Sequence, residues 1–187
     1  AFMSLGGYLM MPWGSAFAVN NVGISQKELP LLFMIVGIST FLIMPLIGML
    51  ADKINKFQLF MIASIIMIAA VVVYVRLEHS TFLILVLVNV FMMGGIMARM
   101  VPSQALTSAV PEPHDRGAFM SINSSLQQIA GGIAAIIGGK IVWQASPQSP
   151  LMNFEMLGWV VISVILINIF LTQRVYKYVA NNTKEAA

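Results

Sequence analysis

Six long stretches without a charged side chain constrain the fold of this chain more than any other feature of its sequence. They cover residues 1–26, 29–51, 57–75, 80–98, 117–139 and 156–173. Each is long enough to cross a bilayer, because about 20 consecutive apolar residues span the hydrocarbon core as an α-helix. Only 9% of all residues are charged, whereas a soluble domain carries about 25%. The sequence therefore predicts an all-α integral membrane protein with six transmembrane helices in contact with the lipid bilayer.

The connections between these stretches are short and set the limits of the predicted spans. The spans are expected over residues 1–24, 29–51, 57–75, 81–102, 116–142 and 154–173, followed by a polar tail over residues 174–187. Six spans in 187 residues leave no room for a soluble catalytic or nucleic-acid-binding domain. Because the first residue is Ala and no signal-peptide pattern follows it, we expect the chain to begin inside a longer protein.

The distribution of Lys and Arg predicts the orientation in the membrane. Seven of these residues fall on one side of the predicted spans and three on the other. The seven are Lys53, Lys56, Arg99, Arg116, Arg174, Lys177 and Lys184, and the three are Lys27, Arg76 and Lys140. Cytoplasmic loops carry the excess of positive charge, so the first side is expected to be cytoplasmic. Because the number of spans is even, both chain ends are expected on that side.

A short motif lies in the cytoplasmic connection between the second and third predicted spans. Residues 48–56 read Gly-Met-Leu-Ala-Asp-Lys-Ile-Asn-Lys. This motif resembles the signature loop of the major facilitator superfamily, Gly-x-x-x-Asp-(Arg/Lys)-x-Gly-(Arg/Lys). The matching positions are Gly48, Asp52, Lys53 and Lys56. Asn55 stands where the family has Gly, and we expect it to adopt the positive φ that Asn tolerates in tight turns.

A second resemblance covers residues 101–139. They contain Val-Pro-Ser-Gln-Ala, Pro-Glu-Pro-His-Asp-Arg-Gly-Ala and Ser-Ile-Asn-Ser-Ser-Leu-Gln-Gln before a Gly-rich helix. This region is similar to the carboxy-terminal half of bacterial drug/proton and sugar-efflux permeases of the same superfamily. The resemblance implies one half of a secondary transporter, made of two inverted three-helix repeats, in a bacterial inner membrane. It also implies efflux of a small organic solute by alternating access. Residues 131–139 lack the Pro of the antiporter motif, so transport direction and proton coupling stay open.

The resemblance further implies a conformational gate at the cytoplasmic end. In the family, the signature loop holds the two halves together in one state and releases them in the other. The gate residues would be Gly48, Asp52, Lys53, Lys56, Arg99 and Arg116. Three alternatives stay open: Asp52 also suits the N-terminus of the third helix, the lysines also act as orientation signals, and Arg99 also fits snorkelling to lipid headgroups.

Polar and aromatic side chains inside the predicted spans are candidate substrate contacts. An amide at membrane depth needs water or a protein partner, because lipid supplies neither. The family places the first and fourth helices of each half at the substrate cavity. The candidates are Tyr8, Trp13, Asn20, Asn89, Asn123 and Gln127. Such neutral groups imply an uncharged or weakly polar ligand, while interhelical hydrogen bonding by Asn89 and packing by Trp13 are the alternatives.

Residue content argues against enzymes, cofactors and metal sites. The chain has no Cys, and His79 and His114 are expected in loops on opposite sides of the membrane. Paired acids, Ser with His, or a His pair at membrane depth are missing, so no catalytic set is expected. The seven acidic residues fall in loops, at a helix start or in the tail. A proton-carrying carboxylate would therefore belong to the missing amino-terminal half.

Two other architectures fit the same number of spans. A self-contained six-helix protein would work as a homodimeric transporter, with a second copy in place of the missing amino-terminal half. It would otherwise serve as a membrane scaffold, although a scaffold gives no reason for the signature loop. A mass measurement in detergent against the 20.4 kDa monomer separates a dimer from a single chain.

Overall fold

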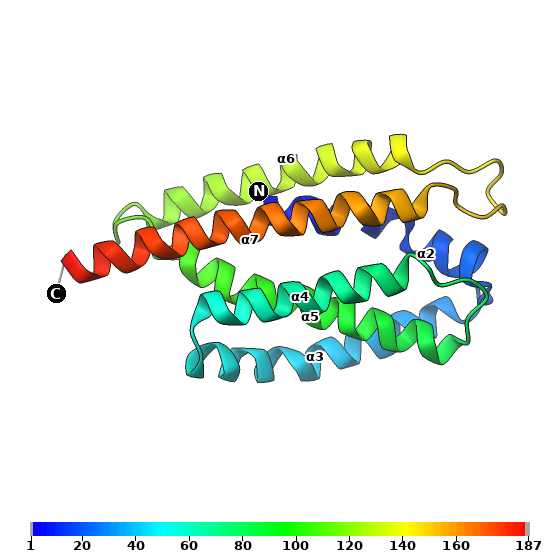
Figure 1. Cartoon of the computed structure of the whole chain (residues 1–187), viewed down its shortest axis with the longest axis horizontal. Helices are drawn as coiled ribbons and strands as arrows, with labels where there is room; N and C mark the ends of the chain where they lie inside the picture. Colours follow the sequence, from blue (N-terminus) through cyan, green and yellow to red (C-terminus); the bar gives the residue numbers. More distant parts are fainter. Residues whose placement is uncertain (1, 186–187) are drawn as a thin grey trace.

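The computed structural model describes residues 2–185, which form six helical segments in an elongated bundle (Figure 1). The first is a broken segment made of α1 (Phe2–Met10), η1 (Met11–Trp13), α2 (Gly14–Phe17) and η2 (Ala18–Val22). The others are α3 (Leu29–Lys53), α4 (Lys56–Tyr74), α5 (Phe82–Ser108), α6 (Arg116–Ile141) and α7 (Phe154–Glu185). The prediction of an all-α fold with six helices is therefore confirmed.

Four of the helices, α3, α4, α5 and α7, are long and apolar enough to cross a membrane by length and composition. The other two segments depart from that description for different reasons. The first segment is broken by a 3₁₀ turn and a π-helical turn. In α6, serines and amides occupy much of residues 121–128, so its first half is amphipathic rather than uniformly apolar.

The break in the first segment begins at Pro12. Proline has no backbone N–H and its ring clashes with the preceding turn, so an α-helix is interrupted there. The chain passes through the 3₁₀ turn η1 at Pro12, re-forms one α-turn, and then widens into the π-helix η2. Gly23 ends the segment with φ of 88°, a conformation that glycine adopts without steric cost. The first segment is therefore an interrupted helix.

Two helices continue past the predicted span limits at the end of the bundle that carries the turn between α3 and α4 (Figure 1). Helix α5 extends to Ser108 rather than ending at residue 102, because Pro102 is accommodated inside it. Helix α7 extends to Glu185, so most of the polar tail predicted over residues 174–187 is helical. Arg99 consequently lies nine residues before the end of α5, or about 13 Å into the helix. Because Arg99 is buried, it is not one of the loop charges from which orientation is predicted. Six Lys and Arg then remain on its side of the predicted spans, against three on the other side.

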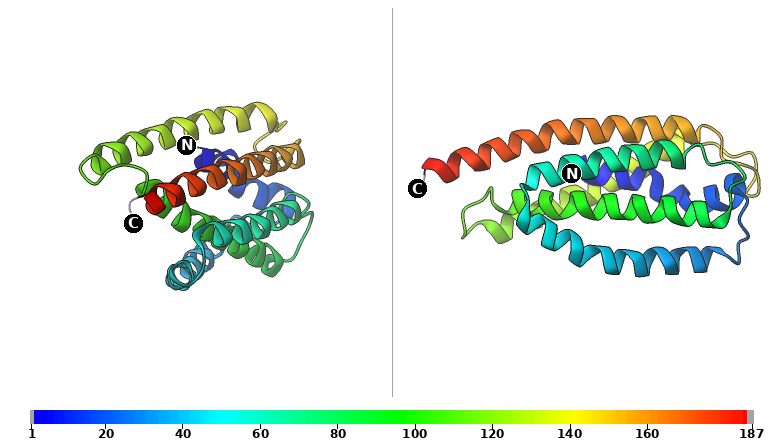
Figure 2. Two further views of the ribbon diagram at one scale, coloured as in Figure 1. Left: turned by 60° about the vertical axis from the view of Figure 1, so that its left-hand side comes forward. Right: turned by 60° about the horizontal axis from the view of Figure 1, so that its bottom comes forward.

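The helices pack as two groups of three. In one group α5 contacts both α3 and α4, and in the other α1 contacts both α6 and α7. Contacts between α4 and α7 join the two groups. Helices α3 and α6 lie on opposite outer sides of the bundle in Figure 1 and in the left view of Figure 2. The surface of α3 is rich in apolar side chains, with Phe41 78% exposed, as expected for a helix that faces lipid or another protein.

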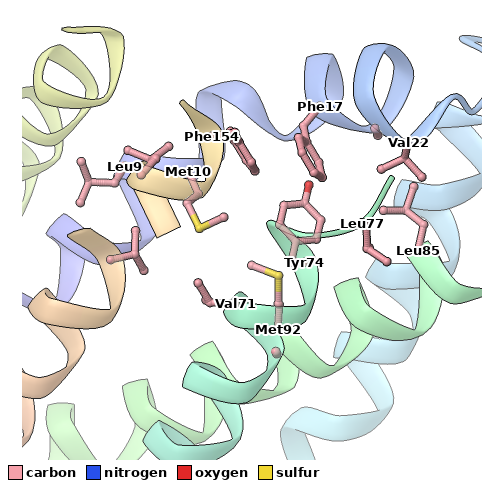
Figure 3. Close-up of a cluster of buried hydrophobic side chains, with 14 of the residues drawn as sticks. Leu9, Met10, Phe17, Val22, Val71, Tyr74, Leu77, Leu85, Met92 and Phe154 are labelled. Carbon is pink, nitrogen blue, oxygen red and sulfur yellow. The ribbon is translucent and has the colours of Figure 1, made fainter. Parts of the chain in front are cut away.

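An aromatic cluster joins the two groups near the end of the bundle that carries the loop between α6 and α7. The ring centroids of Phe17 and Phe154 are 4.1 Å apart, and those of Phe17 and Tyr74 are 5.0 Å apart. Figure 3 shows these rings between α2, α4 and the start of α7. Because each ring comes from a different segment, the cluster fixes the broken first segment against the long helices.

Two glycines allow the first segment to lie directly on α6. A Cβ atom at Gly131 would be 2.9 Å from the ring of Tyr8, and a Cβ atom at Gly138 would be 2.9 Å from the carbonyl oxygen of Leu9. Both distances are shorter than van der Waals contact, so no larger residue fits without a shift. Small residues give close helix approach in membranes, and here they set the contact between α1 and α6.

We predict that Gly138→Ala destabilises the protein by about 1–3 kcal/mol, because the new methyl group meets backbone that cannot rotate away. The measurement is the thermal unfolding of the detergent-solubilised protein. Gly132→Ala on the same helix is the matched control, since a Cβ atom there meets nothing within 4 Å. Equal unfolding temperatures for the two variants would show that α1 and α6 are not in close contact.

Candidate functional site

A seam of polar side chains runs between α1 and α6. The Ser4 hydroxyl donates to Oε1 of Gln127 at 3.3 Å, and the Tyr8 hydroxyl donates to Oε1 of Gln128 at 3.5 Å. Ser4 and Tyr8 are one helical turn apart, so both face α6. Tyr8 is 37% exposed and Gln128 is exposed. We call Ser4, Tyr8, Gln127 and Gln128 the α1–α6 seam.

Two further predicted substrate residues lie along the same contact, at different depths. Trp13 is half-buried, and its Nε1 atom lies 3.1 Å from the position of a Cβ atom on Gly138. Asn123 is half-buried on α6, one turn before Gln127. The structure therefore places Tyr8, Trp13, Asn123 and Gln127 on two adjacent segments.

The remaining two candidates lie elsewhere. Asn20 is in η2 and donates to the carbonyl oxygen of Pro147, in the loop between α6 and α7, at 3.1 Å. Asn89 is half-buried on α5 and donates to the carbonyl oxygen of Leu85, one turn earlier in the same helix, at 2.8 Å. Helix α5 belongs to the other group of three, so the structure does not bring Asn89 together with Gln127.

The structure corrects two expectations about the signature loop. Asn55 has φ of −57°, so the predicted positive φ is wrong. Its Oδ1 accepts the backbone N–H of Phe57 at 2.9 Å, which makes Asn55 the N-cap of α4. Asp52 lies in the last turn of α3, and Asn55 rather than Asp52 caps α4, so Asp52 does not stand at the start of the third helix as expected. An exposed carboxylate at a helix C-terminus is unfavourable toward the helix dipole.

The other signature-loop residues surround this turn. Lys53 ends α3 and Lys56 begins α4, and both are exposed. Gly48 is half-buried, and a Cβ atom there meets nothing within 4 Å. The turn is held against α7 by Tyr176, whose hydroxyl accepts from Asn55 at 2.5 Å and whose ring stacks on Phe57. The loop is therefore a fixed turn whose charged side chains point outward.

Arg99 and Arg116 occupy very different environments. Arg116 is exposed at the first residue of α6. Arg99 is only 5% exposed and lies over the ring of Phe60, with its Cζ atom 5.3 Å from the ring centroid. The snorkelling alternative for Arg99 is therefore wrong, because the guanidinium is inside the bundle.

Sequence reasoning missed several residues that hold these regions together. Ser4 and Gln128 complete the seam, and Tyr176 fixes the signature loop. Asn21 binds both backbone groups of Leu151, donating to the carbonyl at 3.0 Å and accepting from the N–H at 2.8 Å. Gln128 follows directly after Gln127 and Asn21 after Asn20. These pairs of adjacent amides are the sequence signal that could have identified Gln128 and Asn21.

The profile of the Major Facilitator Superfamily matches residues 1–186, which is nearly the whole chain. The chain belongs to the major facilitator superfamily. It is therefore an integral membrane protein of a family of secondary transporters, with lipid around it and a solute as its substrate. Members of the superfamily are not enzymes, so that prediction is confirmed. No curated protein and no solved structure gives a significant match to the chain.

We predict that Asn21→Ala lowers the stability of this superfamily member by about 1–3 kcal/mol, because Leu151 is buried and both its backbone groups lose their partner. Thermal unfolding in detergent measures the loss. Gln148→Ala, in the exposed part of the same loop, should leave the unfolding temperature unchanged. If the two variants unfold alike, the loop is not fixed by Asn21.

Proposed function

We propose that the chain is the carboxy-terminal half of a transporter that exports a small organic solute from the bacterial cytoplasm by alternating access. The protein lies in the inner membrane with both chain ends on the cytoplasmic side. The observation that carries the proposal is the exposed α1–α6 seam. Serine, tyrosine and glutamine side chains on a membrane helix need water or protein, since lipid offers no hydrogen bonds. A seam of this kind suits the wall of an aqueous substrate pathway.

The helix packing supports two inverted three-helix repeats. If the first three segments correspond to the last three, α1 corresponds to α5, α3 to α6, and α4 to α7. Under this correspondence, the contact between α1 and α6 matches the contact between α5 and α3. The contact between α1 and α7 likewise matches the contact between α5 and α4. The contact between α4 and α7 matches itself. These are the five most extensive contacts between different segments. Such a pattern is expected of repeats related by a pseudo-two-fold axis in the membrane plane.

The chemistry of the seam favours an uncharged or weakly polar ligand. Tyr8 offers an aromatic ring and a hydroxyl, while Gln127 and Gln128 offer amides whose hydrogen-bonding groups exceed the single bond each makes here. Asn89 lies on α5, which corresponds to α1 in the other repeat. This correspondence supports a second contact to the substrate, made by Asn89 from the side of the pathway opposite the α1–α6 seam. Trp13, Asn20 and Asn123 complete the proposed substrate surface.

The signature loop supports a gate that closes against another part of the transporter. The contacts within these six helices do not explain why Gly48 and Asp52 are present. Gly48 has free space around it, and the carboxylate of Asp52 interacts unfavourably with the dipole of its own helix. A partner surface would give the glycine a close contact and the carboxylate a positively charged or N–H partner. Lys53, Lys56 and Arg116, exposed around the same end, and the buried Arg99 complete the proposed gate. That surface belongs to the amino-terminal half or to a second copy of the chain.

We predict that inside-out vesicles containing the full transporter accumulate a lipophilic fluorescent solute, and that an imposed pH gradient increases the rate. Gln127→Leu should raise the apparent KM about 5- to 30-fold, since one or two hydrogen bonds to the ligand are lost. Ser163→Ala is the control, because Ser163 is exposed on α7 and binds only its own helix. An unchanged KM for both Gln127→Leu and Tyr8→Phe would remove the seam from the substrate pathway. Uptake only in right-side-out vesicles would reverse the proposed direction.

We predict that Asp52→Asn reduces the transport rate at least about 10-fold while solute affinity changes no more than a few-fold. The reason is position: Asp52 lies at the cytoplasmic end of α3, about half a membrane thickness from the midplane. Equilibrium binding and transport measured on the same preparation separate the two effects. Glu112→Gln, another exposed acid at that end, should change neither. Complete loss of binding in a folded Asp52→Asn protein would contradict the gate.

A further inference from the structure

The interior of the bundle contains a positive charge without a negative partner. Arg99 is 5% exposed, and its Nε and Nη2 atoms are buried without a hydrogen-bond acceptor. The ion pairs found among the side chains of residues 3–181 join Arg76 with Glu155 and His114 with its neighbours Glu112 and Asp115, and none includes Arg99. Phe60 offers only the face of its ring. A buried guanidinium left in this state is strongly unfavourable.

A small cavity adjoins the guanidinium. It has a volume of about 30 Å³ and is lined by Met3, Gly6 and Gly7 of α1, Met67 of α4, Ile96 and Arg99 of α5, and Val161 and Ile165 of α7. Apart from Arg99, no lining residue has a polar side chain. The two glycines leave room where side chains would otherwise fill the space. The cavity is therefore large enough for a carboxylate-sized head group or for one or two waters.

A second unsatisfied donor lies on the helix that closes the cavity. Asn168 is 6% exposed, and its Nδ2 atom has no hydrogen-bond partner. It follows Ile165 by one turn on the same face of α7, so it continues the wall that Ile165 forms. Every buried side-chain atom without a partner in the described chain is an N–H donor: Trp13 Nε1, the two Arg99 nitrogens and Asn168 Nδ2. Trp13 packs against Gly138 of α6, whereas Arg99 lines the cavity, so the unmet groups at the cavity itself are the two Arg99 nitrogens.

The depth of the site limits what reaches it. Phe57 stacks on Tyr176 at the cytoplasmic end, and Phe60 on α4 and Thr172 on α7 each lie one turn further into the bundle. Arg99 lies over Phe60, so its guanidinium is about one turn, or 5 Å, inside that end. The cavity is small and, apart from Arg99, its lining is apolar. A small anion or a single side chain fits.

We propose that the Arg99 cavity is a binding site for a carboxylate-sized anionic group, held by the fork of Arg99 Nε and Nη2. A carboxylate accepts two parallel N–H bonds from a guanidinium, and it supplies both the missing acceptors and the missing charge. The site differs from the α1–α6 seam, and it does not depend on the direction of transport. Two sources carry this chemistry: a small anion from the cytoplasm, or a carboxylate side chain that the rest of the transporter brings to the site.

The test compares arginines in matched settings. Arg174 also lies over a phenylalanine, Phe170, at 4.8 Å, but it is exposed. Unfolding temperatures of the full transporter in nanodiscs are measured for the wild type, Arg99→Met, Arg99→Lys and Arg174→Met. Each is titrated with acetate, with ionic strength held constant by bulky gluconate, and acetamide serves as the neutral analogue.

A free anion predicts that acetate, but not acetamide, raises the unfolding temperature of the wild type and Arg174→Met by at least about 3 °C, and that Arg99→Met loses the effect. A carboxylate of the transporter itself predicts no effect of acetate. In that case Arg99→Met unfolds earlier than wild type at pH 8, the difference shrinks toward pH 5 as the abandoned carboxylate is protonated, and Arg99→Lys recovers part of the loss.

The proposal is overturned if acetate has no effect and Arg99→Met is as stable as wild type, since water alone would then fill the cavity. A loss of stability in Arg99→Met that is the same at every pH overturns it as well, because that is the result of altered packing. An acetate shift that persists in Arg99→Met places the anion elsewhere and has the same consequence. If Arg99→Met does not fold, Arg99→Lys and the acetate titration of the wild type decide the question.

Discussion

The close contact between the broken first segment and α6 is the interaction on which most of this structure depends. A helix interrupted by a 3₁₀ turn and a π-turn has weaker internal hydrogen bonding, which a membrane does not compensate. Helix α6 supports the α-helical part of this segment through packing, because Gly131 and Gly138 allow the ring of Tyr8 and the backbone of Leu9 to touch it. The seam of polar residues exists only because the two segments are this close.

The same contact explains how the far end of the first segment is held. Asn20 and Asn21 bind the loop that connects α6 with α7, and Phe17 stacks on Phe154 at the start of α7. The first segment therefore leans on α6 and α7 along its length, through packing at one end and through backbone-directed amide bonds at the other. A segment held in this way is expected to move with α6 and α7 as one body when the transporter changes state.

The number and order of the helices could be predicted because each membrane span appears in the sequence as a long apolar stretch, which composition alone reveals. The signature loop was likewise readable, since its residues are contiguous. Helix limits could not be predicted as closely, because membrane helices tolerate proline: α5 continues through Pro102 to Ser108. The burial of Arg99 against Phe60 depends on packing between α4 and α5. Partners such as Tyr8 and Gln128, 120 residues apart, follow from tertiary packing that local spacing does not contain.

The buried arginine changes what the amide-rich seam implied about the ligand. Neutral amides alone favour an uncharged solute, yet a cation inside the bundle, about 13 Å from the end of its helix, needs negative charge nearby. None of the ion pairs among the described side chains provides it. In the architecture that we propose, the negative charge comes either from the partner half or from a bound anion. In both cases we expect the occupancy of the proposed Arg99 site to depend on the state of the transporter, because only a conformation that brings the negative group close relieves the buried charge.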